Sequence, residues 1–352
     1  MHKKRYAYTF YLLRKDKHNI LKIKFSDVMS DKKSVLKDTS SFNIKPVNQW
    51  IDYGLTLPKS RPLFGSIWHE YEVAIAFANT GKGKSINSYQ IFDAISKGHP
   101  VLGLDTTKSK VLYFDFELSS RSLVTRYTND NDEPYSFSDS FLRAEIDYST
   151  IDIHSVSIEN GILDQIEADV VKHKPTAICI DNISFISANN EKSKDALEFS
   201  KGLLKISRSL KVAILILAHR PKSQDITAPI NLDHLAGSKA LSNFCDQCFS
   251  ICDSVQGTDI VYIKELKNRN RRIIYDSENV IECRIVKDDK FLKFDKIGIG
   301  IEADHLFKVQ NKSASKLGDI LALKEEGLSN VKIGEKLGIS EGTVRNILKK
   351  EN

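Results

Sequence analysis

The chain has 352 residues, of which 41% are hydrophobic and 28% charged, and it carries only 17 glycines and 8 prolines. This composition excludes a fibrous repeat and wholesale disorder. The chain is longer than the length at which a single hydrophobic core usually stops growing, so we expect one large domain with smaller attachments. Its apolar runs, such as VAILILA at 212–218, are far shorter than the about 20 residues that span a bilayer. We therefore expect a globular protein with no membrane partner, and basic residues after the first apolar stretch argue against a signal peptide.

The net charge of +6 is unevenly distributed, with +8 in residues 1–50, +2 in residues 311–352 and −4 between them. Basic ends favour a polyanionic partner such as nucleic acid, although a solvated lysine-rich face gives the same pattern. Five cysteines, an odd number, favour a cytoplasmic location over a disulfide framework. Cys245, Cys248 and Cys252 lie close together, and we interpret them as small packed residues rather than a metal site, which needs a fourth ligand.

Two apolar stretches within residues 6–27 predict a β-hairpin in a basic amino-terminal region, residues 1–47. From about residue 60, short apolar strands alternate with helical patterns, which is typical of a parallel sheet covered on both faces. The expected strands are residues 72–78, 110–116, 151–156, 176–183 and 212–218, and the expected helices are residues 84–98, 121–127, 160–173 and 191–210.

After residue 240 four apolar segments follow one another closely, at 248–254, 259–266, 271–276 and 280–288. We expect them to be antiparallel additions to the sheet. Together the elements predict an α/β domain over residues 48–307, followed by a polar linker at 308–316 and a small helical domain at 317–352.

The sequence ANTGKGKSI at residues 78–86 follows an expected strand and opens an expected helix, which is the context of a phosphate-binding P-loop. Ala78 stands where the usual pattern has glycine, and it is the smallest side chain that still permits the tight turn. Lys84 is expected to reach the β- and γ-phosphates, and Ser85 to bind Mg²⁺. With ATP and Mg²⁺ as cofactors, the expected binding residues are Ala78, Asn79, Thr80, Gly81, Lys82, Gly83, Lys84, Ser85 and Ile86. A glycine-rich turn without a ligand is the alternative.

A nucleotide triphosphatase also needs an acidic residue at the end of a buried strand, and Asp181 is placed to act on Mg²⁺. No glutamate lies beside it, so the group that orients the attacking water must come from elsewhere. Glu117 follows the strand after the P-loop helix, at the edge where ligands bind in open α/β sheets. Asp115 is a weaker rival for this role, and Glu117 could instead cap the following helix.

A strand ending in Glu117, then a small polar segment and a helix carrying Arg126, resembles the RecA-like hexameric helicases and RecA-type ATPases. Residues 234–251, HLAGSKALSNFCDQCFSI, also resemble the plasmid replicative helicases of the RepA type and the related mobile-element ATPases. The resemblance covers residues 50–300. It implies a RecA-like P-loop core, activation of water by Glu117, and a homo-oligomer, a hexameric ring, that acts on DNA.

The same resemblance places His219 where the family carries a polar sensor of the γ-phosphate, although a histidine after a strand is also common at protein surfaces. It gives Lys267 and Arg269 the spacing of a Lys-x-Arg finger that enters the neighbouring subunit's site. Such a finger stabilises charge developing on the γ-phosphate. A basic solvent-facing turn is the alternative for this pair.

Residues 323–352 show two helical patterns joined by a short turn, with apolar residues at inward-facing spacings. Ser329 and Ser340 are expected N-caps, and Gly338 supplies the sharp turn. The pattern resembles the helix-turn-helix of sigma-factor and LuxR-type DNA-binding domains, which implies that the second helix enters the major groove. The residues expected to contact DNA are Thr343, Arg345, Asn346 and Lys349. A protein-docking element is the alternative.

Two functions from different classes fit this sequence. The first is an oligomeric, Mg²⁺-dependent ATPase that acts on DNA as the replicative helicase of a plasmid or mobile element. The second is an ATP-controlled DNA-binding regulator or loader without strand separation. Both require the P-loop, and they differ in whether DNA accelerates hydrolysis and whether a duplex is unwound.

Overall fold

The computed structural model describes residues 13–16, 19–21, 42–146, 158–182, 192–220, 228–235, 238–306 and 312–348. The chain divides into two compact units, residues 1–59 and residues 60–352. In the first unit, β1 (Leu13–Asp16) and β2 (Asn19–Leu21) form an antiparallel pair within the expected hairpin. The helix α2 (Val47–Thr56) has no buried residue. It falls within the first unit, and the boundary between residues 47 and 48 that the sequence indicates stays a prediction.

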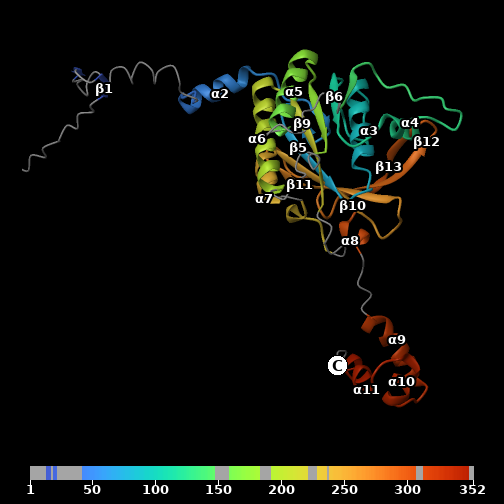
Figure 1. Ribbon diagram of the computed structural model, residues 1–352. Coiled ribbons are helices and arrows are strands. Elements are labelled where there is room, and N and C mark those ends of the chain that lie inside the picture. The colour runs from blue at the N-terminus through green and yellow to red at the C-terminus, as the bar shows by residue number, and fades with distance from the viewer. Residues whose placement is uncertain are drawn as a thin grey trace, which may run out of the picture. The chain divides into compact units, whose positions relative to one another are not determined.

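The second unit contains a nine-stranded sheet in the order β13-β12-β11-β10-β5-β9-β8-β6-β7 (Figure 1). Its parallel strands are β5 (Val73–Ala78), β6 (Val111–Asp115), β7 (Phe141–Glu145), β8 (Ala177–Asp181), β9 (Ala213–His219) and β10 (Gln247–Asp253). Its antiparallel additions are β11 (Ile260–Asn268), β12 (Val280–Asp288) and β13 (Phe291–Gly300). A mainly parallel sheet with antiparallel carboxyl-terminal strands confirms the expected fold class.

Helices cover both faces of this sheet (Figure 1). On one side lie α5 (Ile158–His173), α6 (Lys192–Leu210) and α7 (Ser238–Phe244), and on the other lie α3 (Lys84–Lys97) and α4 (Ser120–Tyr127). Successive side chains of a strand point to opposite faces, so β5 contributes to two cores. Its alanines 74, 76 and 78 pack on the α3 side, while Val73, Ile75 and Phe77 pack on the other. Three short elements complete this part: the hairpin of β3 (Pro62–Phe64) and β4 (Trp68–His69), the 3₁₀ turn η2 (Leu232–His234), and α8 (Glu302–His305).

The register of the parallel strands aligns their carboxyl ends. Ala78 pairs with His219 across β5 and β9, and Asp115 pairs with Asp181 across β6 and β8. Ligand sites of open α/β sheets form at this edge. The fold therefore brings together four segments that are far apart in the sequence.

Three expectations about the strands need correction. The strand at 247–253 pairs in parallel with β5, so it extends the parallel sheet and only the three strands after it are antiparallel. Residues 271–276 form no strand, because Glu265 accepts the backbone N–H groups of Ile274 and Tyr275 and holds them in a loop. The edge strands β7 and β13 were not expected. The expected strand at 151–156 lies outside the described residues.

The carboxyl-terminal helices are α9 (Lys312–Glu325), α10 (Asn330–Leu337) and α11 (Glu341–Leu348). They share a small core of Ile320, Leu323, Ile333 and Val344. The expected caps are confirmed, since Ser329 Oγ accepts from Lys332 N–H and Ser340 Oγ from Thr343 N–H, and Gly338 ends α10 at a φ of 63°. Because serine and lysine do not break a helix, α9 begins at Lys312, inside the segment that we expected to be linker. No helix in the described parts of the chain is both long and apolar enough to cross a bilayer.

Candidate nucleotide site

The P-loop connects β5 to α3 at the aligned edge of the sheet. Gly81 and Gly83 have positive φ angles of 78° and 80°, which glycine adopts without strain. Gly83 is required for a second reason, because a Cβ there would lie 2.7 Å from the ring of Phe294 on β13. The loop thus presents backbone N–H groups at the start of a helix, which is the arrangement that binds phosphate.

The loop is braced from β10 by Asp253, a residue that the sequence analysis missed. Its carboxylate accepts a hydrogen bond from Asn79 Nδ2 and lies 2.6 Å from Lys82 Nζ. Asp253 reaches these two P-loop side chains because β10 runs parallel to β5 and ends beside it. We missed Asp253 because we expected this strand to be antiparallel, which would not have placed its last residue beside the P-loop.

Asp181 is fully buried at the end of β8, and Tyr113 OH donates to its Oδ2 at 2.7 Å. Burial raises the pKa of Asp181 to about 6, and the charges of Asp115 and Glu117 add to the rise, while the hydroxyls of Ser85 and Tyr113 oppose it. Its other oxygen, Oδ1, is buried and accepts no hydrogen bond from the residues that the structure describes.

An orphaned carboxylate oxygen beside the P-loop serine fits Mg²⁺. Carboxylate and hydroxyl oxygens are the ligands that Mg²⁺ prefers, and this ion is usually held by one or two carboxylates together with substrate phosphates. A divalent cation would also stabilise the charged form of Asp181, which burial disfavours. The residues present, Ser85 and Asp181, are therefore suited to hold Mg²⁺ as the sequence predicts.

A chain of polar contacts runs from the P-loop lysine to Glu117. Lys84 Nζ lies 3.1 Å from Nδ1 of His219, and Nε2 of His219 lies 2.8 Å from Nδ2 of Asn182. The same Asn182 amide donates to Glu117 Oε1, which is 3.5 Å from His219 Nε2. An ammonium can only donate, so Nδ1 of His219 accepts, and a neutral ring then carries its proton on Nε2, on the side of Glu117 Oε1. The Nδ2 of Asn182 is also a donor, so its hydrogen bond goes to Glu117 and not to His219. Asn182, next to Asp181, was noted in the sequence but given no role there.

The electrostatics of this chain keep Glu117 ionised. A hydrogen bond from His219 lowers its pKa most, and this outweighs partial burial, with further help from the Asn182 amide and the Lys84 charge. Burial lowers the pKa of Lys84, while the charges of Asp181 and Glu117 oppose the change. Glu117 is only half-buried, with 47% of its side chain exposed, so a water molecule can reach it.

Asp115 is not free to compete with Glu117. It is 2% exposed, and both of its oxygens accept hydrogen bonds, from Tyr89 and Arg143 on one side and from the Glu117 and Leu118 backbone on the other. The helix after Glu117 is capped by Ser119, whose Oγ accepts from Ser122 N–H. Glu117 is therefore not needed as that cap.

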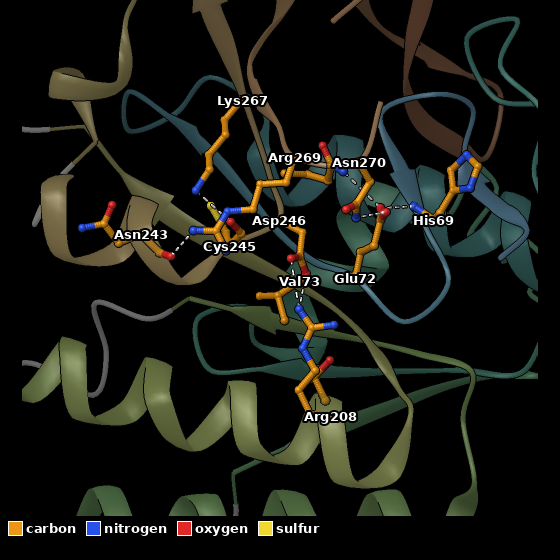
Figure 2. Close-up of polar contacts among 12 residues, drawn as sticks. His69, Glu72, Val73, Arg208, Asn243, Cys245, Asp246, Lys267, Arg269 and Asn270 are labelled. Atoms are coloured by element: carbon orange, nitrogen blue, oxygen red, sulfur yellow. Dashed lines mark hydrogen bonds and ion pairs between the residues drawn. The ribbon is translucent and has the colours of Figure 1, made fainter. Parts of the chain in front are cut away.

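Lys267 pairs with Cys248 near the start of β10, so Lys267 and Arg269 lie at the opposite end of the sheet from the P-loop. Figure 2 shows both side chains beside Asn243 and Cys245. Lys267 Nζ donates to the carbonyls of Ser242 and Cys245, and Arg269 Nη2 donates to Asn243 O at 2.6 Å, so both bind the carboxyl end of α7. The backbone of Arg269 bonds to Asp246, which in turn bonds to Val73 at the start of β5. The five steps from Val73 to Ala78 span roughly 17 Å at the rise of a β-strand, so the pair lies far from its own P-loop.

The expected DNA contacts fall on α11. Thr343 and Arg345 are exposed, Thr343 bonds to Ser340 at 2.8 Å, and Arg345 is paired with Glu341 at 2.6 Å. Asn346 lies in the same helix, and Lys349 lies outside the described residues.

Comparison with known proteins gives a family match over residues 39–225, the AAA domain. A solved structure, that of a KaiC-like protein from the hyperthermophilic archaeon Pyrococcus horikoshii OT3, is 11% identical with a TM-score of 0.47, covering 68% of this chain and 100% of that one. No curated protein has significant similarity to the chain. Since the family match covers more than half of the chain and includes the P-loop, Glu117, Asp181 and His219, the chain belongs to the AAA domain family and has the core of a RecA-like P-loop ATPase.

Proposed function

We propose that this ATPase hydrolyses ATP with Mg²⁺ as a homo-oligomer, a hexameric ring, and acts on DNA as the replicative helicase of a plasmid or mobile element. The observation that carries the hydrolytic part is the row of contacts from Lys84 to His219 and from His219 to Glu117, which Asn182 also binds. It links the group that binds phosphate to a carboxylate that is ionised and open to water.

In the proposed reaction, Lys84 leaves His219 and binds the oxygens of the β- and γ-phosphates. The Glu117 carboxylate accepts a proton from a water molecule and directs its oxygen at the γ-phosphorus. A bond forms between this oxygen and phosphorus as the bond to the β-phosphate oxygen breaks, leaving ADP and phosphate. When held by Ser85 and Asp181, Mg²⁺ neutralises the charge that develops on the phosphate oxygens.

The oligomeric part rests on where Lys267 and Arg269 lie. They are at the far end of β5 from their own P-loop, and their side chains are held on the carbonyls of α7. A ring in which this end of one subunit faces the next subunit's P-loop would bring the pair to a neighbour's γ-phosphate. Loss of such a basic group from a phosphoryl-transfer site costs orders of magnitude in rate.

The DNA part rests on the carboxyl-terminal helices and on the excess positive charge at both chain ends. A turn at Gly338 joins α10 to α11, as in a helix-turn-helix, and α11 exposes Thr343 and Arg345. This geometry suits a helix that enters the major groove.

The test is steady-state ATP hydrolysis without DNA and with single-stranded or duplex DNA, together with unwinding of a labelled fork. The helicase proposal predicts stimulation by single strands and ATP-dependent unwinding. Hydrolysis that single strands leave unchanged, with no unwinding, would instead favour the ATP-controlled regulator. Deleting residues 312–352 should leave basal hydrolysis intact and weaken duplex binding, and unchanged duplex affinity would contradict the assignment of α11.

A further inference from the structure

The candidate catalytic residue Glu117 lies on a turn, residues 116–119, between β6 and α4. Such a turn does not fix a carboxylate by its own regular hydrogen bonds. Positioning matters, because a misplacement of about 1 Å can cost about 100-fold in rate. The structure holds this turn from two sides with an ion pair of the buried Asp115 and the partly buried Arg143.

The first side is Asp115, the last residue of β6. Its Oδ1 accepts from Leu118 N–H at 2.8 Å and from Glu117 N–H at 3.3 Å. Its Oδ2 accepts from Tyr89 OH at 2.8 Å and from Arg143 Nε at 2.9 Å. One buried carboxylate thus connects the backbone of Glu117 to α3 and to β7.

The second side is Arg143 on β7. Besides pairing with Asp115, it donates from Nη2 to the carbonyl of Leu118 and from Nη1 to Glu145 at 2.6 Å. Partial burial alone would lower the pKa of Arg143, but the hydrogen bonds that it donates to Glu145 and Asp115 outweigh burial and hold the pKa above its ordinary value. The turn residue Leu118 is therefore held at its N–H by Asp115 and at its carbonyl by Arg143.

We propose that Asp115 and Arg143 form a positioning pair that sets the Glu117 carboxylate against the attacking water. The pair rests on the proposed function, since it acts only through Glu117. Neither residue touches the nucleotide in this assignment, so the pair governs kcat and leaves nucleotide affinity unchanged. It also explains why an edge strand, β7, carries an arginine that is only 18% exposed.

The decisive variant is Asp115→Asn. The asparagine amide has one oxygen that accepts and one NH2 group that only donates. Its oxygen can accept either from the backbone N–H groups of the turn or from Tyr89 and Arg143, but not from both sets. We expect kcat to fall about 10- to 100-fold, with the Kd for ATP within about threefold of wild type. Arg143→Lys keeps the charge but replaces the planar guanidinium, whose three nitrogens bond separately to Asp115, Glu145 and Leu118, with a single ammonium, and it should give a smaller loss of kcat. Thermal unfolding of each variant shows whether the fold is kept, and Tyr89→Phe, which removes one bond to Asp115, supplies a milder variant.

The matched control is Glu70→Gln. Glu70 is also a buried carboxylate that accepts from an arginine side chain and from a backbone N–H, here both from Arg61, and it lies before the start of β5. Its loss should cost stability comparable to that of Asp115→Asn and leave kcat within about twofold of wild type. A fall of kcat in both variants would mean that kcat follows general stability, and would overturn the positioning pair.

A double-mutant cycle with Glu117→Gln separates positioning from structure. If Asp115 acts through Glu117, then Asp115→Asn lowers kcat in the wild-type background and has no further effect when Glu117 is glutamine. If the losses of kcat in the two single variants add in the double variant, the positioning pair is overturned and the role of Glu117 stands. The same holds if Asp115→Asn keeps the wild-type kcat while Glu117→Gln is slow. Wild-type hydrolysis by Glu117→Gln itself would overturn the proposed catalytic role, and the pair with it.

Discussion

Nζ of Lys84 lies 3.1 Å from Nδ1 of His219, so the P-loop lysine contacts the residue at the end of β9. A triphosphate must draw Lys84 away from His219. His219 also contacts Asn182 and lies near Glu117. Phosphate binding is therefore expected to change the contacts of the Glu117 carboxylate as well.

We predict that His219→Ala keeps nucleotide binding but loses hydrolysis. Removing the imidazole frees Lys84 from a competing partner, so ATP affinity should be equal to that of wild type or up to about 10-fold tighter, the effect of one hydrogen bond to a charged group. The hydrolysis rate should fall at least about 10-fold, because Glu117 loses a partner that holds its orientation. Titration of labelled ATP and ADP, followed by phosphate release, measures both quantities. Unchanged hydrolysis would assign His219 to the protein surface rather than to the site.

We predict that Arg269→Ala binds ATP normally, hydrolyses it poorly, and regains activity when mixed with Lys84→Ala. Interfaces that combine an intact P-loop with an intact Arg269 from the neighbouring subunit form only in the mixture. Phosphate release should be measured at several mixing ratios under conditions in which subunits exchange. Lys201→Ala, which removes an exposed α6 lysine paired with Glu198, is the control and should behave as wild type. Full activity of Arg269→Ala in a demonstrated monomer would contradict the finger.

We predict that Glu72 stabilises the fold in a pH-dependent way. Burial alone would raise its pKa, but hydrogen bonds from Arg271 and Asn270 outweigh burial and hold the pKa below the ordinary 4.5. Figure 2 shows Asn270 beside Glu72. A lowered folded pKa means that the stabilisation is complete above the ordinary pKa and is lost as the pH falls through the folded value. Glu72→Gln should therefore cost about 2 to 4 kcal/mol near pH 7, with a smaller difference from wild type near pH 3.5.

Urea unfolding at several pH values checks this prediction. Glu198→Gln removes the exposed partner of Lys201 and should change the free energy of unfolding by less than about 1 kcal/mol at any pH. If the difference in the free energy of unfolding between wild type and Glu72→Gln does not shrink in acid, the charge of the Glu72 carboxylate is not the source of the stabilisation.

We predict that Gly334→Ala unfolds the carboxyl-terminal helices. A Cβ at this position in α10 would lie 2.6 Å from the backbone oxygen of Ile339, so the turn before α11 would have to move. The cost should be about 1 to 3 kcal/mol, and amide hydrogen exchange in α9, α10 and α11 of the full chain should accelerate. Gly342→Ala is the matched control, since its Cβ would meet only Ser340 Oγ at 3.8 Å. Equal exchange in the two variants would contradict the close approach of α10 to the turn.

The sequence predicted most of the P-loop core, because its strands and helices are long and their apolar patterns are regular. Strand direction was harder to predict. The segment around 247–253 is buried on both faces and pairs in parallel with β5, which only tertiary packing decides. Because of that error we did not place Asp253 beside the P-loop. We also missed Arg143, because β7 is a short edge strand whose partly exposed residues give no regular apolar pattern. The role of Asp115 could not be read from its sequence position, since a carboxylate two residues before Glu117 fits a catalytic and a positioning group equally well.

The central claim is that Glu117 activates the attacking water and that ATP binding does not depend on Glu117. It is tested most directly by measuring ATP binding and phosphate release in wild type and Glu117→Gln, with Lys84→Ala as the variant that should lose both. The account predicts that Glu117→Gln binds ATP with wild-type affinity and releases phosphate at least about 100-fold more slowly. Equal rates of phosphate release in wild type and Glu117→Gln would contradict it.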